Sequence, residues 1–207
     1  MPDDPKSKPP KFSLTRRTFL KSAGLASAGA ASVGLLEDLA AQQTSPVQGP
    51  DAVPVTLSVN GEQRRLNVEP RTTLAEALRD ELHLTGTKII CDRGACSACT
   101  VMLDNVPVAS CMTLAIDAQA RKIRTIESLG QADKLHPVQA AFIEHDGMQC
   151  GFCTPGMVMS CTHLVESNPH PSDADVRQAI SGNICRCGTY PKVIAAVLSA
   201  TNQKSEA

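Results

Sequence analysis

Cysteine spacing is the feature that most constrains this chain, because eight of its nine cysteines fall into two sets with the spacing of metal ligands. The first set runs Cys91-x4-Cys96-x2-Cys99, and Cys111 follows on a neighbouring segment. The pattern C-x4-C-x2-C…C is the plant-type [2Fe–2S] spacing. Small residues between these cysteines let the backbone curl around a cluster. The first set therefore predicts a [2Fe–2S] cluster held by four thiolates.

The second set is Cys150-x2-Cys153 followed by Cys185-x-Cys187. Four thiolates in a C-x2-C…C-x-C array fit a second [2Fe–2S] cluster, but the array alone fits a structural zinc site as well. Disulfides are a further alternative for both sets, since cysteines pair in proteins of oxidising compartments. The spacing of the second set by itself leaves these interpretations open.

Charge and aromatic content give no case for a nucleic-acid partner. The formal net charge is −1, so the chain lacks the basic footprint of a nucleic-acid-binding domain. There is no Trp, one Tyr and four Phe, so stacking platforms for bases are scarce as well. We expect no nucleic acid among the partners.

The N-terminal segment Thr15–Lys21, which reads TRRTFLK, is followed by an apolar run over Ala23–Leu36. Two arginines ahead of Phe-Leu-Lys and a weakly hydrophobic stretch resemble a twin-arginine (Tat) export signal. The apolar run is shorter than the roughly 20 residues that a membrane-spanning helix needs, so we expect no stable membrane span. The prediction is a signal peptide over residues 1–41 and a periplasmic protein exported in the folded state.

Export through the twin-arginine route favours a cofactor over a disulfide framework. The route carries folded proteins, so a cluster built in the cytoplasm would cross with its thiolates already bound to metal. In the oxidising compartment beyond, free thiols would otherwise pair as disulfides.

After a linker over residues 42–52, the pattern predicts a small mixed β-sheet domain over residues 53–127. Val53–Val59 alternates apolar and polar residues, and Asn60-Gly61 is a two-residue hairpin turn. Thr73 and Glu76 form a capping box that opens a helix through about Leu82. Short strands at 100–103 and 106–108 are expected to flank Asp104-Asn105 as a second hairpin, and a last short strand is expected at 122–126.

Residues 128–201 predict a compact helical domain, and residues 202–207 a disordered tail. Pro137, Ser172 with Asp175, and Pro191 each mark the start of a helix, and Thr154 and Pro155 are expected to be the N-cap and first residue of another. The expected helices cover about 137–145, 154–165, 173–180 and 191–198. Cys161, the ninth cysteine, lies on the second of these helices and is expected to be a packed core thiol.

Three stretches together resemble the iron–sulfur subunits and domains of the molybdenum hydroxylases, the xanthine oxidase and aldehyde oxidoreductase family. They are Cys91–Val101, Gln149–Met157 and Gly182–Tyr190, and all eight cysteines match in register. The chain looks most like the iron–sulfur subunit of a periplasmic aldehyde oxidoreductase. Ser97 departs from the pattern, since the family usually has Gly there. Serine is small enough for the loop, so we expect the cluster to be kept.

The resemblance implies an α+β fold, in which a ferredoxin-like β-grasp domain precedes a four-helix-bundle-like [2Fe–2S] domain. It implies electron transfer from a molybdenum-cofactor-binding large subunit, which hydroxylates an aldehyde or an N-heterocycle. It also implies that the helical-domain cluster lies nearer to molybdenum than the ferredoxin-type cluster. Electrons would leave to an FAD-binding subunit or a c-type cytochrome. The family pattern also implies contacts from Gln149 and Cys187 to the molybdopterin on the partner chain.

Two other functions compete with this interpretation. One is a free-standing exported ferredoxin with two clusters, although a simple carrier needs no helical domain. The other is a zinc-binding structural module. In either case the chain has no catalytic centre of its own, and the substrate site of the leading interpretation lies on another chain.

Overall fold

The computed structural model describes residues 17, 49–131 and 133–202. The predicted signal peptide, apart from Arg17, most of the predicted linker and residues 203–207 therefore lie outside the described residues. The chain divides into two units, Met1–Val47 and Gln48–Ala207, and every described residue except Arg17 lies in the second. Among the described residues, no helix combines the length and apolar character needed to cross a membrane.

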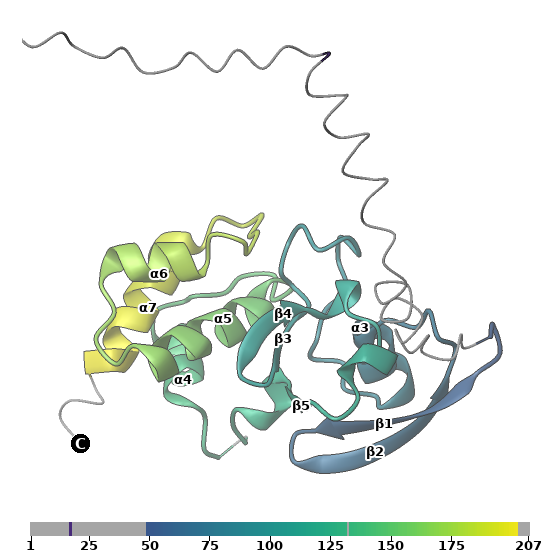
Figure 1. Cartoon of the computed structure of the whole chain (residues 1–207). Coiled ribbons are helices and arrows are strands. Elements are labelled where there is room, and N and C mark those ends of the chain that lie inside the picture. Colours follow the sequence, from purple (N-terminus) through teal and green to yellow (C-terminus); the bar gives the residue numbers. More distant parts are fainter. Residues whose placement is uncertain (1–16, 18–48, 132, 203–207) are drawn as a thin grey trace, which may run out of the picture. The chain divides into compact units, whose positions relative to one another are not determined.

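The first half of this unit is a five-stranded mixed sheet with the strand order β2-β1-β5-β3-β4 (Figure 1). Strand β1 pairs antiparallel with β2 and parallel with β5, and β3 pairs antiparallel with both β4 and β5. The strands are β1 (Val53–Val59), β2 (Glu62–Val68), β3 (Thr100–Leu103), β4 (Val106–Ala109) and β5 (Lys122–Arg124). The predicted strands are present, and the last is shorter than expected, because residues 126–128 form a 3₁₀ turn.

Alternation and turn chemistry explain the two hairpins. In β1 the residues Val55, Leu57 and Val59 are buried, while their neighbours face outward or lie half-buried. The turns Asn60-Gly61 and Asp104-Asn105 both have positive φ at their two central positions. That conformation is the type I′ turn, whose twist matches the twist of the strands.

The helix that crosses the sheet begins as predicted and then changes type. Thr73 and Glu76 form the capping box, with Glu76 N–H donating to Thr73 Oγ1 at 3.2 Å. Only α3 (Leu74–Glu76) is α-helical, and η1 (Ala77–Glu81) continues it as a π-helix. The prediction of a single α-helix is therefore wrong for the second half of this segment. There the Leu82 N–H donates to the Ala77 carbonyl, five residues earlier, which is the hydrogen bond of a π-helix.

The second half of the unit consists of four helices around their own apolar core (Figure 1). They are α4 (Pro137–Glu144), α5 (Thr154–Ser167), α6 (Asp173–Ala179) and α7 (Tyr190–Asn202). Phe142, Met157 and Val197 are fully buried among them. The boundaries of two helices differ from the expectation. Cys153, and not Thr154, occupies the N-cap of α5, and α7 begins one residue before Pro191 and runs past Leu198.

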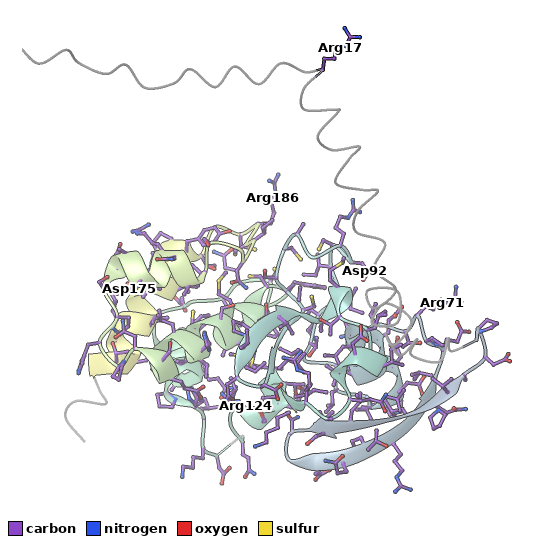
Figure 2. All side chains as sticks on the ribbon, in the orientation of Figure 1. Arg17, Arg71, Asp92, Arg124, Asp175 and Arg186 are labelled. Carbon is purple, nitrogen blue, oxygen red and sulfur yellow. The ribbon has the colours of Figure 1, made fainter. Side chains whose placement is uncertain are left out.

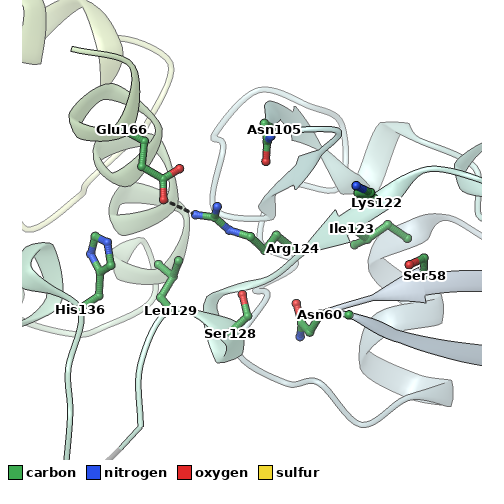
Figure 3. A pocket seen from close by; sticks show the side chains of 11 residues that line it. Ser58, Asn60, Asn105, Lys122, Ile123, Arg124, Ser128, Leu129, His136 and Glu166 are labelled. Carbon is green, nitrogen blue, oxygen red and sulfur yellow. Dashed lines mark hydrogen bonds and ion pairs between the residues drawn. The ribbon is translucent and has the colours of Figure 1, made fainter. Parts of the chain in front are cut away.

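An ion pair joins the two halves at the end of β5. Arg124 Nη2 lies 2.7 Å from Glu166 Oε1 on α5, at the wall of a pocket of about 690 Å³ (Figure 3). Both side chains are about one-third exposed, so the pair is a modest stabiliser. None of the described residues that line this pocket is a cysteine.

A tighter contact joins the first turn of α5 to the loop that precedes β3. A Cβ atom on Gly156 would overlap the Ser97 carbonyl oxygen and lie 2.9 Å from the Ala98 Cα. Only glycine lets the helix approach this backbone so closely. The same loop carries three cysteines of the first set, so Gly156 presses the helical half against it.

We predict that Gly156→Ala lowers the free energy of unfolding by about 1–3 kcal/mol, because backbone must move to accommodate the methyl group. Denaturant unfolding monitored by circular dichroism measures this. Gly182→Ala is the matched control, since its Cβ would meet only the Ser97 hydroxyl, at 3.3 Å. Equal losses in the two variants would contradict the packing argument.

Candidate iron–sulfur centres

The first cysteine set lies together on one loop and the adjoining hairpin. Cys96, Cys99 and Cys111 are buried, and Cys91 is half-buried. The loop of residues 91–99 leads directly into β3, and Cys111 lies on the 3₁₀ turn that follows β4. The Ser110 hydroxyl donates to the Cys99 carbonyl at 2.6 Å and so ties this turn to the loop.

Contacts among these thiols show that all four converge. The backbone N–H of Arg93 and then the Cys96 side chain hydrogen-bond Cys91 and lower its pKa to about 7. Burial and the neighbouring Cys99 raise the pKa of Cys111 to about 11, although the Gly94 N–H donates to its sulfur at 3.3 Å. Backbone N–H groups aimed at sulfur stabilise negative charge there.

Left-handed backbone allows the loop to curl around this point. Asp92, Gly94 and Ser97 have φ values of 51°, 69° and 53°. Glycine adopts this region without steric cost, which gives a physical reason for the glycine that the family pattern has at position 97. In this chain Ser97 adopts the same conformation, so the loop keeps its course despite the substitution.

The second set lies on two loops of the helical half. Cys150 is exposed, Cys153 and Cys187 are half-buried, and Cys185 is buried. Cys150 and Cys153 directly precede α5, while Cys185 and Cys187 lie between α6 and α7. Cys153 interacts with both Cys185 and Cys150, and the Cys187 N–H hydrogen-bonds Cys185. Three thiols of the set are thereby brought together, with the backbone of the fourth beside them.

A hydrogen bond between two thiols of this set moves their pKa values in opposite directions. Burial and then the Cys185 side chain raise the pKa of Cys153 to about 12. Burial acts to raise the pKa of Cys185 too, but hydrogen bonds from Thr189, Cys153 and the Cys187 backbone outweigh it. The pKa of Cys185 therefore lies at about 7. The Thr189 hydroxyl is 3.2 Å from this sulfur.

The donor set fits thiolate-ligated clusters. All nine cysteines are free thiols, and those of each set repel one another when ionised, so bound cations would stabilise them. Among the described residues, no group of three or more His, Cys, Asp or Glu side chains is placed to hold a single metal ion. A two-iron cluster does not require this, since four cysteines serve two irons.

The two cysteine-bearing loops are directly hydrogen-bonded to each other. Ile184 N–H donates to the Cys96 carbonyl at 3.1 Å, and Asn183 Nδ2 donates to the Ser97 carbonyl at 3.2 Å. Cys96 belongs to the first set, and Ile184 is the chain neighbour of Cys185 in the second. One hydrogen bond and a few covalent bonds therefore connect the two sets.

Exposed residues surround the second set. Phe152 and Ile184 are large apolar side chains that are 61% and 55% exposed. Gln149 is also exposed, and Arg186 projects outward from its loop (Figure 2). A single exposed apolar residue needs no explanation, but two beside one cysteine set mark a surface that can be covered by another protein.

Some residues that the sequence singled out lie away from both sets. Cys161 is fully buried in α5, and burial raises the pKa of its thiol to about 12, so the expected core role is confirmed. The Ser172 N–H and hydroxyl hydrogen-bond Asp175 and lower its pKa, which confirms a helix-capping role. The sequence pattern did not predict the hydrogen bonds made by Asn183 and Tyr190, although both residues lie in the motif Gly182–Tyr190.

Two family models match the chain in succession. A 2Fe-2S iron-sulfur cluster binding domain matches residues 57–123, and a [2Fe-2S] binding domain matches residues 125–198. The iron-sulfur-binding subunit PaoA of an aldehyde oxidoreductase from Escherichia coli O157:H7 is 43% identical. The match covers 96% of this chain and 93% of PaoA.

This chain belongs to the [2Fe–2S] small subunits of the molybdenum hydroxylase family. The nicotine 6-hydroxylase small subunit of Paenarthrobacter nicotinovorans is 46% identical over 74% of this chain and 92% of its own. A quinoline 2-oxidoreductase chain from Pseudomonas putida 86 superposes with a TM-score of 0.68 at 42% identity. That match covers 74% of this chain and 98% of the other.

Family membership settles the cofactor type and the general role. Small subunits of this family carry two [2Fe–2S] clusters and transfer electrons in molybdenum hydroxylases that act on aldehydes and N-heterocycles. Two [2Fe–2S] domain matches favour iron over zinc for the second cysteine set, which its spacing alone left open. The α+β fold, a β-grasp sheet followed by a helical domain, is confirmed.

Proposed function

We propose that the two cysteine sets each ligate one [2Fe–2S] cluster, in domains that span residues 53–127 and 128–201. Cys91, Cys96, Cys99 and Cys111 would hold the ferredoxin-type cluster, and Cys150, Cys153, Cys185 and Cys187 the helical-domain cluster. Each cluster, when bound, accepts and releases one electron at a time. The convergence of the thiols within each set supports this assignment.

The hydrogen bond from Ile184 N–H to the Cys96 carbonyl carries the proposal of electron transfer between the sets. It completes a short path for electrons that runs from Cys185 along the backbone to Ile184 and across the hydrogen bond to Cys96. Both cysteines at the ends of this path are buried. The helical-domain set would receive electrons first and the ferredoxin-type set second.

The molybdenum-cofactor-binding large subunit would dock on the exposed face around the second set. Phe152 and Ile184 offer apolar area there, and Gln149 offers an exposed amide beside Cys150. An amide both donates and accepts hydrogen bonds, and a thiolate accepts them, so Gln149 and Cys187 suit the polar edge of molybdopterin. Because PaoA matches 96% of this chain, we propose an aldehyde as the substrate of the assembled enzyme.

The electron acceptor would dock near the first set. Ile90 and Met112 directly adjoin Cys91 and Cys111 and are 50% and 65% exposed. An FAD-binding subunit or a c-type cytochrome would cover this apolar area and take electrons from the ferredoxin-type cluster.

Export of the folded protein to the periplasm by the twin-arginine route is part of the proposal and rests on Arg16 and Arg17.

The two centres should respond separately to substitution. Fully loaded protein should hold about four irons per chain. Cys96→Ser should remove the ferredoxin-type signal in electron paramagnetic resonance (EPR), and Cys185→Ser the helical-domain signal, because each belongs to its own set. Cys161→Ala is the control and should keep both signals. Loss of both signals from either serine variant, in folded protein, would refute the division into two sets.

Gln149→Ala should leave both EPR signals intact and slow the reduction of the clusters by substrate, or weaken binding of the large subunit. The physical reason is loss of a hydrogen bond worth on the order of 1 kcal/mol. Stopped-flow reduction of the assembled complex measures the rate. Gln178→Ala on the exposed face of α6 is the matched control. If the two variants behave alike, Gln149 does not contact the pterin.

Replacing Arg16 and Arg17 by Lys should leave folded, iron-bearing protein in the cytoplasm, because the twin-arginine signal requires the arginine pair. Cell fractionation and iron analysis measure this. The matched control is the same change at Arg64 and Arg65, an exposed arginine pair on β2. Normal export of the N-terminal variant would contradict the route.

A further inference from the structure

Tyr190, the only tyrosine of the chain, makes two hydrogen bonds to the loop that carries Cys185. Its hydroxyl accepts from the Cys185 backbone N–H at 2.8 Å and donates to the Asn183 carbonyl at 3.0 Å. The ring packs against the helical core at the first residue of α7. The phenol therefore holds the cysteine loop in a fixed place relative to this helix.

Asn183 extends the same network to the other cysteine set. Its side chain is 4% exposed, and its Nδ2 donates to the Ser97 carbonyl in the first loop. Ser97 lies directly after Cys96, whose carbonyl accepts the Ile184 N–H. A chain of contacts thus runs from Tyr190 through Asn183 to the ferredoxin-type loop.

We propose that Tyr190 and Asn183 are positioning residues with separate tasks. Tyr190 sets the environment and hence the reduction potential of the helical-domain centre, and Asn183 sets the spacing of the two centres. This inference rests on the proposed function, since it requires that Cys185 and Cys96 are cluster ligands.

The Tyr190 hydroxyl acts by accepting the hydrogen bond of the Cys185 backbone N–H. That N–H donates to oxygen and so is withheld from sulfur. Phenylalanine would fill the same space without the oxygen, leaving the Cys185 N–H and the Asn183 carbonyl without this partner. The loop would loosen and admit water. Hydrogen bonds to cluster sulfurs and exposure to solvent both stabilise the reduced form and raise the potential.

Asn183 acts on the other side of the loop. Asn183→Ala removes the donor to the Ser97 carbonyl but keeps the backbone carbonyl that accepts the Tyr190 hydroxyl. The environment of Cys185 should therefore change little. The contact between the loops should weaken, because one of its two hydrogen bonds is lost.

The experiment is an EPR-monitored redox titration of the full chain in its assembled complex. Tyr190→Phe should shift the midpoint potential of the helical-domain centre to a more positive value and change its g-values, while the ferredoxin-type centre keeps both. Asn183→Ala should keep both potentials and change the magnetic coupling between the two reduced centres. Thr201→Val is the matched control, because Thr201 is a buried hydroxyl of α7 that bonds only its own helix.

Iron retention gives a second measurement that remains informative if Tyr190→Phe folds poorly. Tyr190→Phe should release iron from the helical-domain centre to a chelator faster than the Thr201→Val control.

Tyrosine emission of the unaltered chain reports on the surroundings of Cys185, since the chain has no tryptophan and Tyr190 is its only tyrosine. A cluster bound at Cys185 should quench that emission.

Unchanged potential, g-values and iron release in Tyr190→Phe would overturn the role of Tyr190. Unchanged magnetic coupling in Asn183→Ala would overturn the role of Asn183. Both tests require that the unaltered protein shows two [2Fe–2S] signals. A parent chain that holds no second cluster at all would instead refute the proposed function, so the two failures are distinct.

Discussion

Close approach of the first turn of α5 and the 183–185 loop to the Cys96–Ser97 backbone is the interaction on which the arrangement depends. Gly156 packs without a side chain against Ser97 and Ala98, while Ile184 and Asn183 donate hydrogen bonds to consecutive carbonyls of this loop. Because the carbonyls of this loop accept hydrogen bonds from the helical half, the loop cannot move relative to that half without breaking them. The sheet and the helices therefore form one body around the two cysteine sets, as the compactness of residues 48–207 shows.

Both sets use local backbone to stabilise sulfur, but they do so from different structures. In the first, one loop with left-handed residues turns its N–H groups toward thiols, as the Gly94 N–H does toward Cys111. In the second, two loops meet at the ends of helices, and the Thr189 hydroxyl supports Cys185. The first set thus depends on local chain geometry, whereas the second depends on how α5, α6 and α7 pack. Substitutions in the helical core should affect the second set more than the first.

Much of the fold could be predicted from the sequence, since the signals were local. The hairpin turns, the capping boxes at Thr73 and Ser172 and the four helices follow from turn chemistry, side-chain caps and proline positions. The π-helix at Ala77–Glu81 could not be predicted, because its five-residue hydrogen bonds leave no mark in the apolar spacing. The true N-cap of α5 was missed because a cysteine rarely occupies that position, while Thr154 is a normal capping residue.

The sequence by itself determined the chemistry, because the eight cysteines and the three motifs that surround them together identify the family and its two [2Fe–2S] clusters. Only the tertiary structure decided how the two centres are joined. The bonds from Ile184 and Asn183 to Cys96 and Ser97 connect residues almost ninety positions apart, and no spacing rule relates such residues. It also assigned the only tyrosine to the loop of Cys185. A hydrogen-bond partner is set by where a donor lies in space, and for distant residues only packing determines that place.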